Sequence, residues 1–284
     1  MVILNSPFES FPKFSLDETN VLSPPCNYFD VEDIPFSQNE NYFYLLLLNI
    51  RSCRRNFLNF VCHFNQHLCK YDCIVFTETW LTGDYSDLFK INGFKHYDSC
   101  RTQYGGGIRI YVRKECDLRI LSDFTSLNDI FEIFSAEVVT DHRKFILSVF
   151  YHRPTADHAL NNLFIEECSY KLRQLLSTGL PVVTCGDFNL NILNPLRLNY
   201  INNFINSMLE LGFYPGVTIP TKYNEGNPIT KFAILDLVWT SESSIIDSTF
   251  VIPAQITDHF PVLTKLSLKV KKTRSSSILS ANIQ

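Results

Sequence analysis

Eight short segments of the chain are apolar, or alternate between apolar and polar residues, as β-strands do. They are rich in β-branched and aromatic side chains, which favour strands. The segments span residues 45–50, 73–79, 107–112, 130–139, 145–151, 181–187, 234–240 and 261–268. The pattern therefore predicts a domain in which strands are the main elements.

Apolar residues recur at helical spacing between some of these strands. Segment 55–71 places five of them on one face of a helix: Phe57, Phe60, Val61, Phe64 and Leu68. Segments 160–176 and 198–211 behave similarly. Strands that outnumber helices, in sheets that need cover on both faces, predict a four-layer α/β sandwich with two packed mixed β-sheets flanked by helices.

The two ends of the chain lack this periodicity. Residues 1–41 hold several prolines and many polar residues, so we expect a leader that is flexible or loosely packed. Residues 269–284 are basic and then serine-rich, as in a tail. The domain is therefore expected over residues 42–268. Its most apolar run, 42–50, is far shorter than the ~20 residues that a membrane span needs, and the N-terminus resembles no secretory signal.

The composition, with 45% hydrophobic and 19% charged residues, is that of a globular protein. A net charge of −4 excludes a broadly basic surface for nucleic acid, although it allows a local basic face. The nine cysteines form no CxxC pair and no Cys/His cluster at zinc spacing. Free thiols indicate a reducing compartment, so we expect the nucleus or the cytoplasm and no secretion.

Polar side chains lie at the ends of six predicted strands. An ordinary turn would explain any one of them, but it would not explain the whole set. They are Asn49, Glu78, Tyr151, Asp187 with Asn189, Asp236, and Asp258 with His259. Asp236 lies inside the apolar run ILDLVW, where a buried carboxylate is costly unless it is paired. If these strand ends share one side of the sandwich, the side chains form a single acidic pocket.

The residue types in this set suit one kind of chemistry. Oxygen ligands from Glu78, with Asp187 or Asp258, favour Mg²⁺. A histidine with a carboxylate behind it, His259 with Asp236, forms an acid/base or charge-stabilising dyad. Asparagine and tyrosine can hold a phosphate oxygen or a water, so the whole set predicts hydrolysis of a phosphate ester. The glycine run YGGGIRIYV lacks the GK[ST] ending of a P-loop and predicts a tight hairpin.

Seven short motifs follow one another in an order that resembles a known family. They are LNI, TETW, GGGIRIYV, FYHRP, CGDFN, LDLV and TDHFP, between residues 42 and 268. In this order they resemble the endonuclease/exonuclease/phosphatase (DNase I-like) superfamily, and they are most similar to the apurinic-type endonuclease domain of non-LTR (LINE-like) retrotransposons. The resemblance implies a Mg²⁺-dependent DNA endonuclease, with Mn²⁺ able to substitute. Its nick leaves a 3′-hydroxyl that primes reverse transcription, by a reverse transcriptase domain in the same polyprotein of a full-length element.

The resemblance also implies where the metal binds. Glu78 corresponds to the principal Mg²⁺ ligand, Asn49 begins the same site, and Asp258 assists. Some relatives carry a second acidic residue after the first-strand asparagine, but this chain has Arg51 there. That departure weakens the case for a second metal at this position.

Five further residues take catalytic roles by the same resemblance. Asp187 orients the attacking water and helps to deprotonate it, while Asn189 holds the water or the phosphate. Tyr151 contacts the scissile phosphate or stabilises the transition state. Asp236 orients His259, which binds or protonates near the phosphate. The motif around Tyr151 reads YHRP instead of the expected YRPP, so the following histidine is an addition.

The substrate is less well defined than the reaction, because the fold hosts several. A DNA-cutting enzyme needs basic and aromatic residues around its pocket. The candidate contacts are Arg51, Arg153 and Lys222. Arg54, Arg55 and Arg101 are further basic candidates. One alternative is a phosphatase or phosphodiesterase that acts on an inositol phosphate, a lipid or RNA. A second is an inactive retrotransposon-derived relic, although every expected catalytic position is filled.

Overall fold

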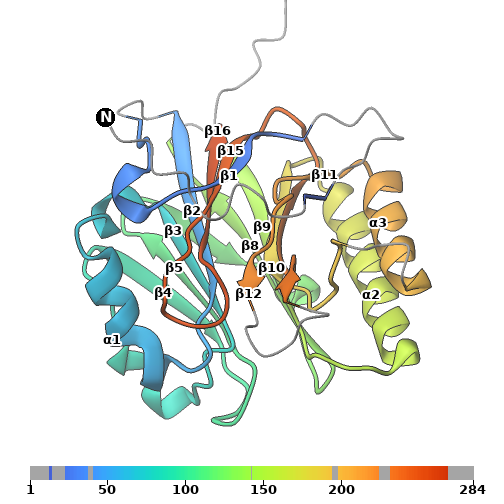
Figure 1. Cartoon of the computed structure of the whole chain (residues 1–284), viewed down its shortest axis with the longest axis horizontal. Helices are drawn as coiled ribbons and strands as arrows, with labels where there is room; N and C mark the ends of the chain where they lie inside the picture. The colour runs from blue at the N-terminus through green and yellow to red at the C-terminus, as the bar shows by residue number, and fades with distance from the viewer. Residues whose placement is uncertain are drawn as a thin grey trace, which may run out of the picture.

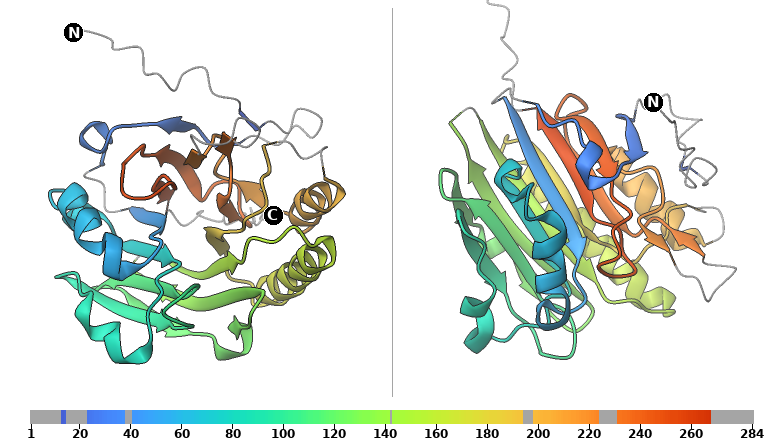
Figure 2. Two further views of the ribbon diagram at one scale, coloured as in Figure 1. Left: turned by 60° about the horizontal axis from the view of Figure 1, so that its bottom comes forward. Right: turned by 60° about the vertical axis from the view of Figure 1, so that its left-hand side comes forward.

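Two mixed β-sheets face each other in the computed structural model, with helices on both outer sides (Figure 1). The structure describes residues 13–14, 23–37, 41–141, 143–193, 198–223 and 231–267. Within them, the layers follow the order helix, sheet, sheet, helix, which the two further views in Figure 2 also show. The predicted four-layer α/β sandwich is confirmed.

The strands of each sheet come from both halves of the chain. The first sheet has the order β1 (Cys26–Tyr28), β15 (Ile246–Val251), β16 (Val262–Ser267), β2 (Tyr42–Asn49), β3 (Cys73–Thr77), β5 (Ile108–Arg113) and β4 (Phe94–Ser99). The second has the order β11 (Tyr214–Pro215), β14 (Asp236–Thr240), β10 (Val182–Asp187), β9 (Lys144–His152), β8 (Phe131–Val139) and β6 (Asp117–Ile120), and β7 (Ser126–Leu127) pairs with β8. A separate pair joins β12 (Lys222–Tyr223) to β13 (Phe232–Ala233).

Three α-helices in the described residues cover the sheets (Figure 1). Helix α1 (Cys53–Phe64) lies on the first sheet, and α2 (His158–Leu176) and α3 (Asn199–Glu210) lie on the second. Short 3₁₀ helices are η1 (Val31–Asp33), η2 (Leu68–Lys70), η3 (Gly83–Leu88) and η4 (Ser122–Phe124). No helix in the described ranges is both long enough and apolar enough to cross a membrane.

Strand β2 explains why the sequence YFYLLLLN is almost continuously apolar. Leu45 and Leu47 belong to the core between the two sheets, whereas Leu46 and Leu48 belong to a second core beneath α1. A strand buried on both faces has no solvent side, so its pattern does not alternate. Its position in the middle of the first sheet fixes Asn49, its last residue, at one end of the sandwich.

The predicted helix over residues 55–71 is shorter in the structure. Helix α1 ends at Phe64, and the chain then turns before the short η2. The hydrogen bond from His67 N to Phe64 O, 2.8 Å long, closes that turn. Leu68, which shares the apolar face in the periodic pattern, still packs against the core beneath α1. The spacing thus identified the right contacts but the wrong helix end.

The described residues of the predicted leader lie against the domain. Strand β1 pairs in parallel with β15, and Thr249 N donates a 2.8 Å hydrogen bond to Pro25 O. Phe14 is only 6% exposed and belongs to the larger hydrophobic core, which also includes residues of α2 and α3. Tyr28 donates a hydrogen bond to Pro220 O. Residues 1–12, 15–22 and 38–40, and the predicted tail 269–284, lie outside the described residues.

Candidate active site

The strand order brings the predicted site residues to one end of the sandwich. Asp187 ends β10, where it lies beside Tyr151 of parallel β9 and opposite Asp236 of antiparallel β14. Asn49 ends β2 in the other sheet, and β3 runs parallel to β2 and ends one residue before Glu78. The ends of parallel strands meet at one edge of a sheet, which is the usual place for a ligand site in such folds.

One side-chain amide joins the two sheets at this end. Asn49 Nδ2 donates hydrogen bonds to Glu78 Oε1 at 3.0 Å and to Asp187 Oδ2 at 2.7 Å. Tyr151 donates its hydroxyl hydrogen to the same Glu78 oxygen at 3.3 Å. All four side chains are buried. The amide therefore holds two carboxylates together that would otherwise repel each other in a site of low dielectric constant.

Glu78 has an unusual backbone conformation, with φ of 52°, and Trp80 has the same value. A non-glycine residue held in this left-handed region costs about 1–3 kcal/mol and persists only where its surroundings impose it. Here Thr79 N and Trp80 N donate to the carbonyl oxygens of Gly107 and Gly106, at 3.1 and 2.9 Å. The carboxylate thus projects from a strained turn instead of continuing β3, which is the kind of strain that accompanies functional sites.

His259 and Asp236 form the predicted dyad. His259 Nδ1 lies 2.8 Å from Asp236 Oδ2, and both residues are 1% exposed. Burial lowers the pKa of His259, but the adjacent Asp236 carboxylate outweighs it, so the net pKa lies above the usual value. Thr221 donates its hydroxyl hydrogen to the same Asp236 oxygen at 2.8 Å. A single threonine carries no signal in a sequence, which is why Thr221 was missed.

Asp187, Asp236 and His259 place possible ligand atoms within 4.8 Å of one another. Burial raises the pKa of Asp187 to about 7, and His259 and Asn49 only partly oppose that effect. Asp236 Oδ1 is buried without a hydrogen-bond partner in the described residues. Buried carboxylates with too few partners gain from a cation, and oxygen ligands suit a divalent one. The donor set of Asn49, Glu78, Asp187 and this cluster therefore fits a divalent metal ion.

Asp258 lies among cations. It pairs with Arg51 at 2.7 Å and with Lys222 at 3.1 Å. Burial would raise the pKa of Asp258, but His259, Lys222 and Arg51 together hold it below its usual value. Among the described residues, no hydrogen bond or ion pair joins Asp258 to Glu78, so its assistance to the metal stays a prediction. Arg51 and Lys222, both candidate substrate contacts, are thereby fixed at the site.

Lys222 also contacts His259. Its ammonium nitrogen lies 3.0 Å from His259 Nε2. An ammonium can donate a hydrogen bond only to a nitrogen without a proton. In this arrangement, therefore, His259 carries its proton on Nδ1, toward Asp236, and both Lys222 and the Nε2 edge of the ring lie where an anion can be bound.

Asn189 follows Asp187 in a turn, with φ of 48°. Its backbone N–H donates to Asp187 Oδ1 at 3.0 Å, and its Nδ2 donates to the carbonyl oxygen of His152 at 2.7 Å. Asn189 therefore helps to orient the Asp187 carboxylate. The turn after β10 thus occurs at Asn189. Gly186 lies inside β10, where a Cβ atom would stand 1.8 Å from the backbone oxygen of Phe150 on β9.

His152, the additional residue of the YHRP motif, packs against the segment that forms this turn. It is fully buried and stacks on Phe164, with ring centroids 4.2 Å apart and an interplanar angle of 2°. Its Nδ1 lies 3.1 Å from Phe188 O, in the segment between Asp187 and Asn189. Burial lowers the pKa of His152 to about 4, so the ring is neutral near pH 7. It acts in packing and backbone support.

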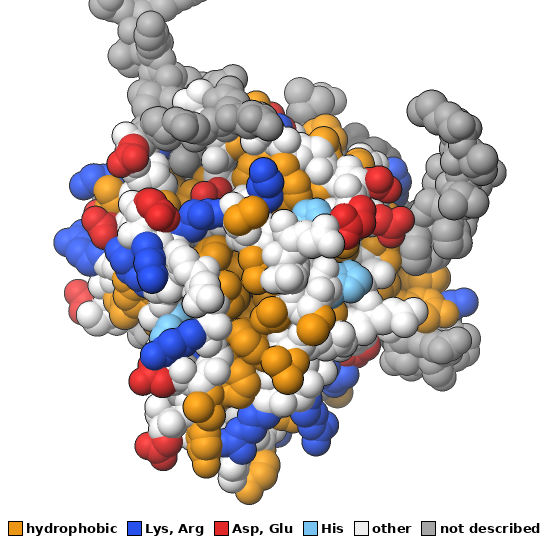
Figure 3. Space-filling model, turned by 90° about the vertical axis from the view of Figure 1, so that its left-hand side faces the viewer, with side chains coloured by type: hydrophobic (Ala, Val, Ile, Leu, Met, Phe, Trp, Pro, Cys, Tyr) orange, Lys and Arg blue, Asp and Glu red, His pale blue; other side chains and the backbone are white. Residues whose placement is uncertain are grey.

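A pocket of about 360 Å³ opens beside Glu78 and Tyr151. Its other lining residues include three arginines, two aromatic side chains and a glycine turn: Arg51, Arg101, Arg153, Trp80, Tyr104, Gly105 and Gly106. Arg54 and Arg55 lie outside this lining, over the rings of Tyr85 and Trp80. On the face that carries α1, Lys and Arg side chains are interspersed with Asp and Glu (Figure 3). The arginines of the pocket therefore form a local basic patch, whereas that face carries mixed charge.

No protein-family model and no curated protein sequence matches the chain. Solved structures share its fold at low identity. The endonuclease domain of TRAS1, a telomere-specific non-LTR retrotransposon, matches with a TM-score of 0.61 and 14% identity, covering 81% of this chain and 100% of that domain. The Xenopus laevis APE2 catalytic domain matches with a TM-score of 0.60 and 14% identity, covering 79% of this chain and 92% of that domain.

A third solved structure, the 3′ phosphatase NExo from Neisseria bound to a product DNA hairpin, matches with a TM-score of 0.61 and 13% identity, covering 79% of this chain and 99% of that one. The chain therefore has the endonuclease/exonuclease/phosphatase (DNase I-like) fold, as its motifs implied. Structures with this fold include an endonuclease and phosphatases, so the fold alone does not select the substrate.

Proposed function

We propose that the protein is a Mg²⁺-dependent phosphodiester hydrolase that nicks DNA and leaves a 3′-hydroxyl. The observation that carries this proposal is the hydrogen-bonded set at one end of the sandwich, in which Asn49 joins Glu78 to Asp187. Beside it, the His259–Asp236 dyad supplies an imidazole that is hydrogen-bonded to a buried carboxylate. In a full-length element, a reverse transcriptase domain of the same polyprotein would extend the 3′-hydroxyl, in the nucleus or the cytoplasm.

The side chains divide the reaction among them. Asp187, oriented by Asn49 and by the Asn189 N–H, accepts the proton of the attacking water. Lys222 donates to a phosphate oxygen, and so does His259 when a second proton, on Nε2, makes it an imidazolium, the form that its raised pKa favours. Tyr151 adds a third donor from the opposite side of Asp187. A divalent ion held by Glu78 and Asn49, with Mn²⁺ able to replace Mg²⁺, would supply positive charge at the phosphate.

The pocket beside Glu78 favours nucleic acid over a small phosphate ester. Guanidinium groups bind successive phosphates of a backbone, and Trp80 and Tyr104 provide surfaces for stacking of bases. Tyr104 is 82% exposed, so its ring is available to a substrate. A second candidate function is a phosphatase, since a mannosyl-6-phosphatase of Bacteroides thetaiotaomicron has the same fold. The filled catalytic positions argue against an inactive relic.

A substrate panel tests the proposal. The protein is incubated with supercoiled plasmid, an inositol polyphosphate and polyadenylated RNA, each in Mg²⁺ and in EDTA. We expect relaxed plasmid only in Mg²⁺, with nicks that a DNA polymerase extends, and little phosphate or adenylate release. Release of inorganic phosphate from the inositol ester without plasmid nicking would replace the endonuclease by the phosphatase.

The pH dependence of nicking gives a second prediction. The base must be ionised, and burial raises the pKa of Asp187 to about 7, so activity is present above that pH and lost as the pH falls through it. A bound cation favours the carboxylate form, so more Mg²⁺ should move the acid limb to lower pH. An acid limb near the ordinary aspartate value of about 4, independent of Mg²⁺, would contradict this role.

A further inference from the structure

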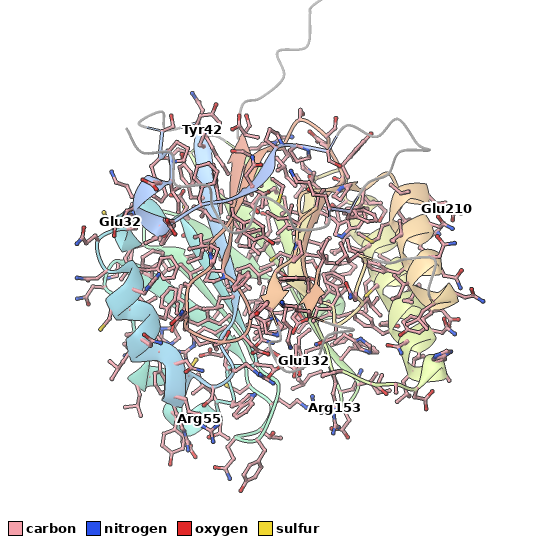
Figure 4. All side chains as sticks on the ribbon, viewed as in Figure 1. Glu32, Tyr42, Arg55, Glu132, Arg153 and Glu210 are labelled. Atoms are coloured by element: carbon pink, nitrogen blue, oxygen red, sulfur yellow. The ribbon has the colours of Figure 1, made fainter. Side chains whose placement is uncertain are left out.

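One buried carboxylate near the site takes no part in the reaction described above. Glu132, on β8, is 0% exposed, and both of its oxygens accept a hydrogen bond from Gly107 N, at 2.8 and 3.0 Å. Arg101 Nη1 lies 3.6 Å from Glu132 Oε1. In Figure 4, Glu132 lies near the same end of the molecule as Arg153, away from Tyr42. A buried charge with so few partners needs an explanation.

Glu132 is a direct neighbour of the site in the second sheet. It pairs in register with Tyr151 across β8 and β9, so both side chains project from the same face. Tyr151 in turn donates to Glu78 Oε1. Glu132 therefore flanks the residues around Glu78 without touching them through any hydrogen bond in the described residues.

The link between Glu132 and Glu78 runs through the glycine turn. Gly107 donates its N–H to Glu132 and accepts at its carbonyl oxygen from Thr79 N, at 3.1 Å. Gly106 accepts from Trp80 N at 2.9 Å. Thr79 and Trp80 directly follow Glu78, and both Glu78 and Trp80 have positive φ. These two hydrogen bonds therefore hold the left-handed segment in place. The position of the Glu78 carboxylate thus depends on where the glycine turn is held.

The turn leaves no room for a side chain at Gly106 or Gly107. A Cβ atom at Gly106 would stand 2.1 Å from Glu132 Oε1, and one at Gly107 would stand 2.4 Å from Thr79 Oγ1. Both glycines also have positive φ, of 73° and 91°. The hairpin predicted for the YGGGIRIYV segment is therefore clamped between Glu132 on one side and the segment after Glu78 on the other.

We propose that Glu132 is a positioning residue for Glu78. Its carboxylate fixes the Gly106–Gly107 turn, the turn fixes Thr79 and Trp80, and these fix the left-handed backbone from which the Glu78 carboxylate projects. This inference rests on the proposed function, because it takes Glu78 as a metal ligand. Residues that orient a ligand in this way typically change metal affinity or activity 10–100-fold when they are replaced.

Metal binding measured without catalysis provides the test. Mn²⁺ binding is followed by the electron paramagnetic resonance signal of the free ion for the wild type, Glu132→Gln and Glu132→Leu. We expect affinity to fall several-fold in Glu132→Gln, whose amide oxygen keeps one acceptor, and at least ~10-fold in Glu132→Leu, which keeps none. Saturating Mg²⁺ should restore most of the nicking rate of Glu132→Gln, which a general loss of structure would not allow.

Glu137→Gln is the matched control, because Glu137 lies on the same strand and pairs with Arg119 at 3.0 Å, away from the glycine turn. Its Mn²⁺ affinity should equal that of the wild type. Glu132→Gln with unchanged Mn²⁺ affinity would overturn the proposal, whether or not Glu132→Leu folds. If the wild type binds Mn²⁺ but nicks no DNA, the proposed function fails while the role of Glu132 is still decided by the binding data. If the wild type binds no Mn²⁺, both are overturned.

Discussion

Replacing Asp187 by asparagine is expected to reduce the rate of plasmid nicking by about 10²–10⁴-fold, the range over which a positioned general base contributes. The side chain keeps its size, but Asn49 Nδ2 and Asn189 N–H donate to different oxygens of Asp187, so the amide oxygen keeps only one of these two hydrogen bonds. It cannot accept the proton of the attacking water. The loss should therefore be in kcat, measured under saturating DNA and Mg²⁺.

The folding of this variant should be unimpaired. Asp187 is fully buried, and burial raises its pKa, so the ionised carboxylate disfavours the folded state relative to a neutral group of the same shape. Removal of the buried charge offsets the loss of one hydrogen bond, so the midpoint of thermal unfolding, recorded in EDTA near pH 8, should change little. Asp87→Asn, at a carboxylate that is 81% exposed and paired only with Lys90 among the described residues, is the matched control and should nick normally. Wild-type kcat in Asp187→Asn would remove Asp187 from the mechanism.

Replacing His259 by alanine is expected to cost about 10²–10³-fold in nicking, as for the loss of one preorganised donor at a phosphate or oxyanion. It also leaves Asp236 buried without its main partner, and breaking such a pair destabilises a protein by about 3–5 kcal/mol. Loss of activity in this variant alone would therefore mix chemistry with folding.

His259→Asn separates the two effects. An asparagine amide can occupy the place of Nδ1 and donate to Asp236 Oδ2, but it has no group at the place of Nε2, beside Lys222. This variant should unfold at a denaturant concentration close to that of the wild type and still lose nicking. His63→Ala, at an exposed histidine of α1, serves as the control. Full activity in His259→Asn would show that Nε2 does not act on the phosphate.

The sequence predicted those parts of the fold whose burial leaves a periodic pattern. The eight predicted strands all occur, because each crosses the interior of a sheet and carries apolar residues on at least one face. The other strands of the described residues were missed: β1, β4, β6, β7, β11, β12, β13 and β15. Among them, β1, β4 and β6 lie at the edges of the two large sheets, with partly exposed side chains, so polar residues interrupt the pattern. Strand β15 lies inside the first sheet, but the polar Asp247 and Ser248 interrupt its apolar run. Pairing with a neighbour, rather than composition, defines these strands.

The candidate site was predictable as a set but not in its contacts. Each strand-end residue is an ordinary turn residue alone, and only their joint occurrence, with the family motifs, indicated one pocket. The partners of Asp258 could not be predicted, since Arg51 is 207 residues away in sequence. Thr221 and Glu132 gave no signal, because a threonine or a glutamate in a strand-rich segment has many uses. Their roles follow only from burial and from hydrogen bonds across the sheets.

The central claim is that these residues form one metal-dependent centre for cutting a DNA backbone. The most direct measurement compares the wild type with Glu78→Gln on supercoiled plasmid, over a titration of Mg²⁺ and in EDTA. We expect the wild type to produce open circles in Mg²⁺ and none in EDTA, and Glu78→Gln to need far more Mg²⁺ for any nicking. Equal nicking by both proteins at every Mg²⁺ concentration, or wild-type nicking that persists in EDTA, would contradict the claim.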